Sequence, residues 1–130
     1  FQAAILIEKL KIFQTELNAR DKIASTYTKL LSGHVKIPFC SADLKSAWAQ
    51  YTIFAENRSD IQAKLNSKNI PNTIYYPIPL SKQKGYAQYP SVSSGLKVSD
   101  LLSDHVLSLP MHPYLADEDV KKIVSAITGD

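Results

Sequence analysis

The sequence predicts an α+β fold in which a long N-terminal helix leads into a small sheet covered by helices. Three observations predict it: an apolar stripe with heptad-like spacing over residues 2–31, a run rich in aromatic and β-branched residues at 46–55, and an amphipathic helical pattern at 117–127. The predicted strands are too few and too short for a doubly wound sheet, and the sequence contains no repeat. Helices on one face of a single sheet fit best.

The first element is a helix over residues 2–31, and Gly33 ends it. Such a helix is about 45 Å long, which is more than a compact domain of this size needs. Its stripe therefore faces either the core of this domain or a further domain or subunit, and both alternatives stay open. No capping residue precedes the helix, so we expect the chain to be a piece of a larger protein. Arg20 fills the one polar slot of the stripe, whose apolar positions are Leu6, Leu10, Phe13, Leu17, Ala24, Tyr27 and Leu31.

Two strands are predicted on either side of a short helix. The first strand lies at 46–55, after a short extended segment at 34–39, and the second lies at 72–76. Between the strands, the sequence SDIQ at 59–62 forms a capping box that opens a helix. The helix must end before Pro71, because the residue before a proline disfavours helical backbone.

The rest of the chain is predicted to be loop and helix. Residues 81–94 form a polar loop with room for one helical turn. A short helix capped by Ser99 runs through Leu107, and a short extended segment follows at 109–113. The acidic residues at 117–119 suit a helix N-terminus, where negative charge is stabilised, and they open the terminal amphipathic helix.

Composition excludes several classes of protein. A chain of 130 residues that is 45% hydrophobic and 21% charged is typical of one globular domain. No apolar run reaches the roughly 18 residues of a membrane span, so no membrane association is expected. The net charge is only +3 and the basic residues form no dense cluster or stripe, so we expect no nucleic-acid partner. One cysteine, Cys40, cannot form a disulfide within the chain, which suits the reducing cytoplasm.

Catalytic and metal-binding motifs are absent from the sequence. The three histidines, His34, His105 and His112, have no metal-ligand spacing to one another or to cysteine. No basic partner is nominated for Cys40, so we read it as a buried or half-buried structural cysteine rather than a nucleophile. No metal site is predicted.

The segment TIYYPIPL at 73–80 has a pattern that suits a binding role as well as a structural one. Two adjacent tyrosines, Tyr75 and Tyr76, end a predicted strand, and two prolines fix the turn after them. Side chains at neighbouring strand positions point to opposite faces, so one ring is predicted to lie in the core and the other at a rim. A phenol at a rim can hydrogen-bond a phosphate, a sugar hydroxyl or a carboxylate.

Four segments in this order, QAAILIEKL, AWAQYTI, YYPIPL and VLSLPMHPYL, followed by an amphipathic helix, resemble the DegT/DnrJ/EryC1/StrS family. Its members are pyridoxal-phosphate-dependent aminotransferases that act on keto-sugars carried on nucleotides. The resemblance spans nearly the whole chain and is nearest to the branch that aminates 3-keto uronic-acid or hexose derivatives of UDP sugars. It implies the small domain of the fold type I aminotransferases: residues 1–33 would link from a large cofactor-binding domain, and residues 34–130 would form the C-terminal small domain.

The resemblance also implies site residues. Family members use the turn at 75–80 to reach the nucleotide-sugar, commonly across a dimer interface, which makes Tyr76 and Tyr75 substrate-binding candidates. The family often has histidine where Tyr75 stands. His112 matches the histidine of the family's LPMHP segment and is the third candidate. Trp48 and Gln50 match the strand before the capping box, with core packing the expected role of Trp48, and His105 occupies an expected surface position.

The implied activity is transfer of an amino group from glutamate to a UDP-linked keto-sugar, in polysaccharide or antigen sugar biosynthesis, by a homodimer. The cofactor, pyridoxal 5'-phosphate, would sit on a lysine of the large domain. No lysine here lies in the family's cofactor-lysine motif, so no catalytic residue is predicted and the chain alone is expected to be inactive. The alternative is a stand-alone, non-catalytic binding or assembly module with the same fold.

Overall fold

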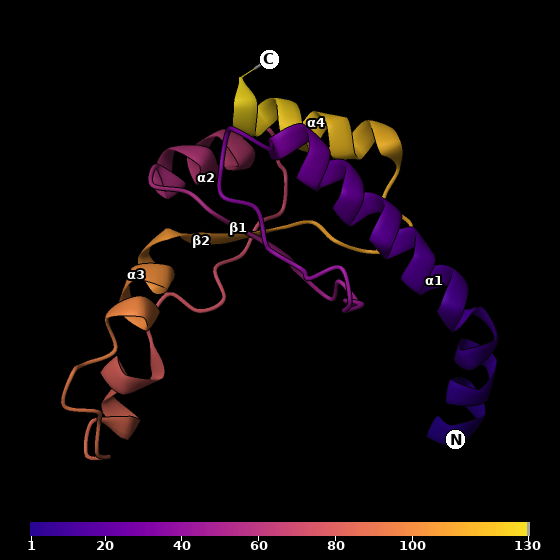
Figure 1. The fold of residues 1–130 in the computed structure, drawn as a ribbon. Helices are drawn as coiled ribbons and strands as arrows, with labels where there is room; N and C mark the ends of the chain where they lie inside the picture. The colour runs from indigo at the N-terminus through magenta and orange to yellow at the C-terminus, as the bar shows by residue number, and fades with distance from the viewer. Residues whose placement is uncertain (130) are drawn as a thin grey trace.

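The computed structural model describes residues 1–129. Figure 1 shows an arch, in which helices α1, α2 and α4 gather at the top while the N-terminal half of α1 and the segment before α3 project as two legs. The predicted α+β class is confirmed. The elements, in chain order, are α1 (Gln2–Leu31), β1 (Tyr51–Phe54), α2 (Arg58–Ser67), the 3₁₀ turns η1 (Leu80–Lys82) and η2 (Lys84–Tyr86), α3 (Lys97–His105), β2 (Val106–Leu109) and α4 (Asp117–Thr128).

The core lies at the top of the arch, where α4 packs against both α1 and α2 and α2 also contacts β2. Helices α2 and α4 and the C-terminal half of α1 bury the apolar face that their periodicity marks. Complete burial of one leucine or isoleucine side chain stabilises a fold by about 1.5–3 kcal/mol, so this cluster dominates the stability. Its largest fully buried side chains are Tyr27, Leu31, Tyr51, Ile53, Leu65, Leu107 and Val120.

The stripe of α1 divides into two halves. Ala24, Tyr27 and Leu31 are buried in the core. Leu6, Leu10 and Phe13 remain 61%, 66% and 50% exposed, because the leg they occupy lies beyond the other elements. The core-facing alternative therefore holds for the C-terminal half of the helix alone.

The sheet is shorter than the sequence predicts. Strands β1 and β2 pair antiparallel from Tyr51↔Leu109 to Phe54↔Val106. The predicted strand at 46–55 starts only at Tyr51, because Trp48 takes a left-handed backbone conformation with φ 46°, which interrupts an extended run. The predicted strand at 72–76 is wrong: within it, Thr73 makes one antiparallel bridge, to Ser108.

Strand β2 occupies the place where the sequence predicted the end of a helix. Helix α3 stops at His105 instead of continuing through Leu107, because the residues from Val106 onward pair with β1 and bury Leu107 and Leu109. Long-range pairing of this kind is invisible to local periodicity. The predicted serine caps are also wrong: α2 begins at Arg58 and α3 at Lys97, and neither has a side-chain hydrogen bond at its N-cap.

Two properties of helix α4 match expectation. Acidic residues occupy its first turn, and Val120, Ile123, Val124 and Ile127 are buried. Over residues 1–129, no helix combines the length and the apolar character that crossing a bilayer would need.

Candidate functional site

The two tyrosines singled out by the sequence lie on the segment between the Thr73 bridge and η1. Their rings contact each other edge to face, with centroids 5.7 Å apart and planes at 72°, and their peptide bond is cis. Tyr75 is 44% exposed and Tyr76 is 71% exposed. The prediction of opposite faces with one ring in the core is therefore wrong, because the pairing needed for a strand stops at Thr73. Both phenols are available to a ligand.

Tyr75 and Tyr76 together line a cavity of about 510 Å³. Aliphatic side chains from the turn and from α3 supply most of its wall, and Gln83, Ser99 and Ser103 add polar groups. An apolar hollow with an aromatic rim and a few polar side chains is typical of a small-molecule site. The apolar lining residues are Ile78, Pro79, Leu80, Leu102 and Val106.

A second, smaller cavity of about 180 Å³ also has Tyr75 in its lining. Gln50, Asn72, Thr73 and Ser108 line it, so its wall is more polar than that of the larger cavity. Tyr75 borders both cavities, and we call the two together the composite site, with the larger cavity as its apolar compartment and the smaller as its polar compartment. Gln50, which the sequence placed in a strand, belongs to this site, although nothing in its local pattern marks it.

His112 is exposed and lines neither cavity. It directly follows Met111, which does line the smaller cavity. The structure thus brings Tyr75 and Tyr76 together and leaves His112 outside the two cavities.

The other residues discussed from the sequence, Trp48, Cys40 and His105, line neither cavity of the composite site. Trp48 is half-buried against the core, as expected. Cys40 is exposed rather than buried, because the loop that carries it leaves the core. His105 lies at the surface, as expected, and is partly covered because its ring stacks on that of Phe54 with centroids 4.9 Å apart.

Side chains of α1 hold the segment that follows β2 beside the smaller cavity. The Tyr27 hydroxyl donates to the carbonyl of Pro110 at 3.0 Å, and Arg20 Nη1 donates to the carbonyl of Met111 at 3.3 Å. Further along, the Tyr114 hydroxyl donates to Glu16 Oε1 at 2.5 Å. The position of Met111 and His112 therefore depends on α1.

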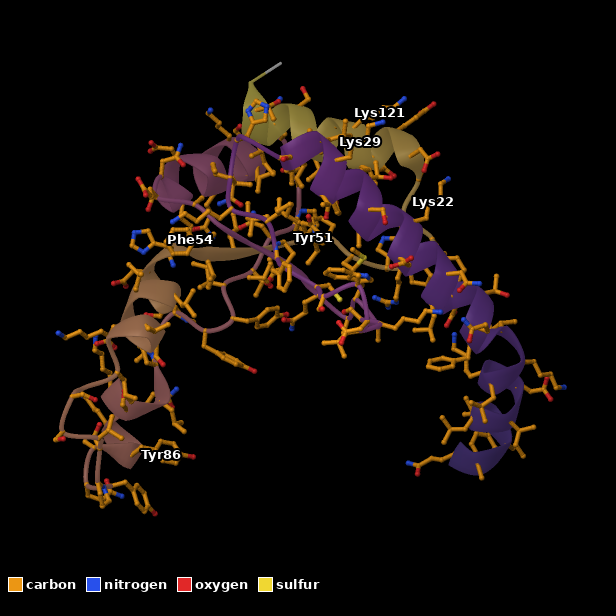
Figure 2. All side chains as sticks on the ribbon, viewed as in Figure 1. Lys22, Lys29, Tyr51, Phe54, Tyr86 and Lys121 are labelled. Atoms are coloured by element: carbon orange, nitrogen blue, oxygen red, sulfur yellow. The ribbon has the colours of Figure 1, made fainter. Side chains whose placement is uncertain are left out.

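Four groups on and beside α1 have shifted pKa values. The hydrogen bond from Tyr114, with a second from Lys9, holds the pKa of Glu16 below its usual value. The same bond raises the pKa of Tyr114. Burial raises the pKa of Tyr27 strongly, and burial also raises the pKa of Tyr51. Figure 2 shows Tyr51 in the middle of the arch and Tyr86 on the leg formed by the segment before α3.

The described residues offer no enclosed place for a metal ion or a lysine-bound cofactor. Over residues 1–129, no three acidic, histidine or cysteine side chains gather to hold a metal. Every lysine of the chain is exposed. A lysine that holds a carbonyl cofactor needs a site that excludes water and lowers its pKa, so these exposed lysines do not fit that task.

Comparison with known proteins identifies relatives over the whole chain. The profile of the DegT/DnrJ/EryC1/StrS aminotransferase family matches residues 1–128. The UDP-2-acetamido-2-deoxy-3-oxo-D-glucuronate aminotransferase of Pseudomonas aeruginosa is 41% identical over 129 residues, which are 98% of this chain and 35% of that protein. The dTDP-3-amino-3,6-dideoxy-alpha-D-galactopyranose transaminase of Aneurinibacillus thermoaerophilus is 32% identical over 97% of this chain and 34% of that protein.

Solved structures agree. A DegT DnrJ EryC1 StrS aminotransferase from Brucella abortus superimposes with a TM-score of 0.95 at 48% identity, covering 98% of this chain and 34% of that one. The chain thus spans about a third of the length of the relatives it matches.

Proposed function

Because the chain belongs to the DegT/DnrJ/EryC1/StrS aminotransferase family, we propose that it is part of an enzyme that transfers an amino group to a keto-sugar carried on a nucleotide. The observation that carries the proposal is the composite site at Tyr75 within a chain that matches the family along its length. The 41% identity to an aminotransferase of a UDP-linked 3-oxo-glucuronate favours a UDP-linked 3-keto-sugar as the substrate.

Tyr76, Tyr75 and His112 are the proposed substrate-binding residues. The phenol of Tyr76, the more exposed of the two, can donate to a phosphate or a sugar hydroxyl, while the aliphatic wall beside it suits a flat ring. The more polar compartment beyond Tyr75 suits a hydroxyl-rich or carboxylate-bearing group. His112 lines neither cavity, so its proposed contact with the ligand would come from outside them.

The proposed cofactor, pyridoxal 5'-phosphate, is held outside this chain, since the exposed lysines do not fit it. When bound, it supplies an electron sink for transfer of the amino group, for which glutamate is the proposed donor. The residues of this chain would bind and orient the sugar nucleotide. We therefore expect the 130-residue chain to be inactive when isolated.

The proposed organisation is a linking helix at 1–33 and a small domain at 34–130. The exposed apolar half of α1 supports it, because a row of uncovered leucine and phenylalanine side chains is costly in water and marks a contact surface. We propose that this face packs on the remainder of the protein, that the enzyme is a homodimer, and that it works in the cytoplasm on polysaccharide or antigen sugars.

The test uses the full-length protein that contains this chain. Glutamate should change the absorbance of the bound cofactor, and a UDP-linked 3-keto-sugar added afterwards should restore it. A protein that restores the spectrum with simple keto acids but with no nucleotide keto-sugar would contradict the proposed substrate class. A protein with no cofactor spectrum would favour the non-catalytic module.

A further inference from the structure

Arg20 is the one polar residue in the apolar stripe of α1, and its guanidinium group joins two distant parts of the chain. Its Nη1 atom donates to the carbonyl of Trp48 at 3.0 Å and to the carbonyl of Met111 at 3.3 Å. The two acceptors lie 28 and 91 residues away along the sequence. We infer that Arg20 is a positioning residue that fixes the walls of the polar compartment beside Tyr75, an inference that rests on the proposed function.

The first wall begins directly after Trp48. Ala49 and Gln50 line the smaller cavity, and the left-handed backbone of Trp48 sets the direction in which they leave. Non-glycine residues rarely adopt this conformation, so it needs support from its surroundings. That support comes from the Arg20 bond, from the Trp48 amide donating to Ser46 Oγ at 3.1 Å, and from the indole donating to Asp21 Oδ1 at 3.1 Å.

The second wall is formed by Pro110 and Met111. The bond from Tyr27 holds the carbonyl of Pro110, and the bond from Arg20 holds the next carbonyl along the chain. The Arg20 bonds join this wall, at Met111, to the wall at Ala49 and Gln50 through the carbonyl of Trp48. The paired residues Tyr51 and Leu109 hold the two walls together at the sheet, and Arg20 joins them again at Trp48 and Met111, beyond that pair along the chain.

The chemistry of arginine suits this task. Its guanidinium stays charged at all physiological pH values and presents several donors in a fixed plane. Hydrogen bonds from a charged donor are stronger than neutral ones, and the contacts here are partly shielded from water. A hydrophobic residue in the same slot would pack against the stripe but would leave both carbonyls without this donor.

The experiment compares three variants of the full-length enzyme. Arg20→Met removes the donors and keeps the alkyl stem, and Arg20→Lys keeps a charge that can donate to the same carbonyls. Lys22→Met is the matched control, since it also removes one positive charge from α1 but breaks an exposed pair with Asp117 that lies outside the site. Michaelis constants for the UDP-linked keto-sugar and for glutamate are measured, together with the thermal unfolding midpoint.

We expect Arg20→Met to raise the Michaelis constant for the keto-sugar about tenfold while that for glutamate stays unchanged, because misplaced binding groups weaken only the ligand they face. Arg20→Lys should recover part of the loss, and Lys22→Met should match the wild type. Equal constants for Arg20→Met and Lys22→Met would overturn the inference. An equal rise in the Michaelis constants for both substrates, together with a lower unfolding midpoint, would also overturn the inference, because it would indicate a purely structural role.

A second readout does not depend on activity. Fluorotryptophan incorporated at Trp48 should give an NMR resonance that shifts or broadens in Arg20→Met and stays in place in Lys22→Met. An unchanged resonance in Arg20→Met would overturn the inference even in an inactive protein. If the wild type transaminates no nucleotide keto-sugar but the resonance moves, the proposed function fails and the role of Arg20 in holding the two walls stands.

Discussion

The hydroxyl of Tyr27 donates a hydrogen bond to the carbonyl of Pro110 at 3.0 Å, which ties the buried half of α1 to the segment after β2. The Tyr27 side chain is fully buried, and its ring lies 5.0 Å from that of Tyr51. One residue therefore serves both the core and the segment that carries Met111 and His112.

The first prediction concerns this bond. Tyr27→Phe keeps the ring but leaves the carbonyl of Pro110 without its donor, so we expect the free energy of unfolding to fall by about 1–3 kcal/mol. Urea unfolding measures it. Tyr89→Phe, which removes a hydroxyl from an exposed ring, should change the midpoint little. Equal midpoints for both variants would show that the Tyr27 bond contributes nothing.

The second prediction concerns alkaline pH. Burial raises the pKa of Tyr27, so the unfolded chain releases this proton first as pH rises. The stability held by the neutral phenol is complete below the ordinary tyrosine pKa of about 10 and is lost as pH rises from there toward the raised value. Unfolding midpoints from neutral pH upward should fall above that point. The fall should be shallower in Tyr27→Phe, with Tyr51 supplying the rest.

The third prediction concerns acid pH. The bonds from Tyr114 and Lys9 lower the pKa of Glu16 in the folded protein. The stability this carboxylate supplies is present above the unfolded pKa of about 4.3 and is lost as pH falls through the lower folded value. Tyr114→Phe should therefore flatten the loss of stability on the acid side. An acid profile identical to the wild type would show that the Glu16–Tyr114 bond is not formed in solution.

The fourth prediction concerns the substrate. In the full-length enzyme, Tyr76→Phe would remove the proposed hydrogen bond to the sugar nucleotide, so the Michaelis constant for that substrate should rise by roughly three- to tenfold. The absorbance of the bound cofactor should stay normal. Tyr89→Phe is the control, because Tyr89 lines neither compartment of the site. A Michaelis constant equal to that of the control would remove Tyr76 from the site.

The fifth prediction concerns the exposed half of α1. Leu10→Glu places a charge on the uncovered stripe and should lower the unfolding midpoint of the full-length protein. In the 130-residue chain alone, where this position is exposed, the same change should have little effect. Thr15→Glu, an exposed position outside the stripe, is the control for added charge. Equal effects of both substitutions on the full-length protein would show that the stripe contacts nothing.

The sequence predicts a structural feature well when that feature depends on residues close together along the chain. Periodicity over long runs predicted α1 to its observed bounds and α4 to within a residue of its end. The strands were less predictable, since β2 forms only by pairing with residues far away and the left-handed Trp48 interrupts the extended run. Short elements of this kind follow tertiary contacts rather than local preference.

The site was predictable only in part, for the same reason. The adjacent tyrosines stand out in the sequence, and the structure places both on one cavity. Gln50 joins them through a turn that no local pattern encodes. Arg20 had a signal, as the lone polar residue in an apolar stripe, but its two acceptors lie on segments that only the fold brings together.

Transfer of an isotope label from glutamate to the sugar is the most direct test of the proposed amino-group transfer. The full-length protein is incubated with nitrogen-labelled glutamate and a UDP-linked 3-keto-sugar, and the sugar nucleotide is analysed by mass spectrometry. We expect a labelled amino group on the sugar in the wild type and much slower labelling when Tyr75 and Tyr76 are both replaced by alanine. A wild-type protein that leaves the keto-sugar unlabelled would contradict the proposed activity. A double variant that labels it at the wild-type rate would contradict the proposed binding site.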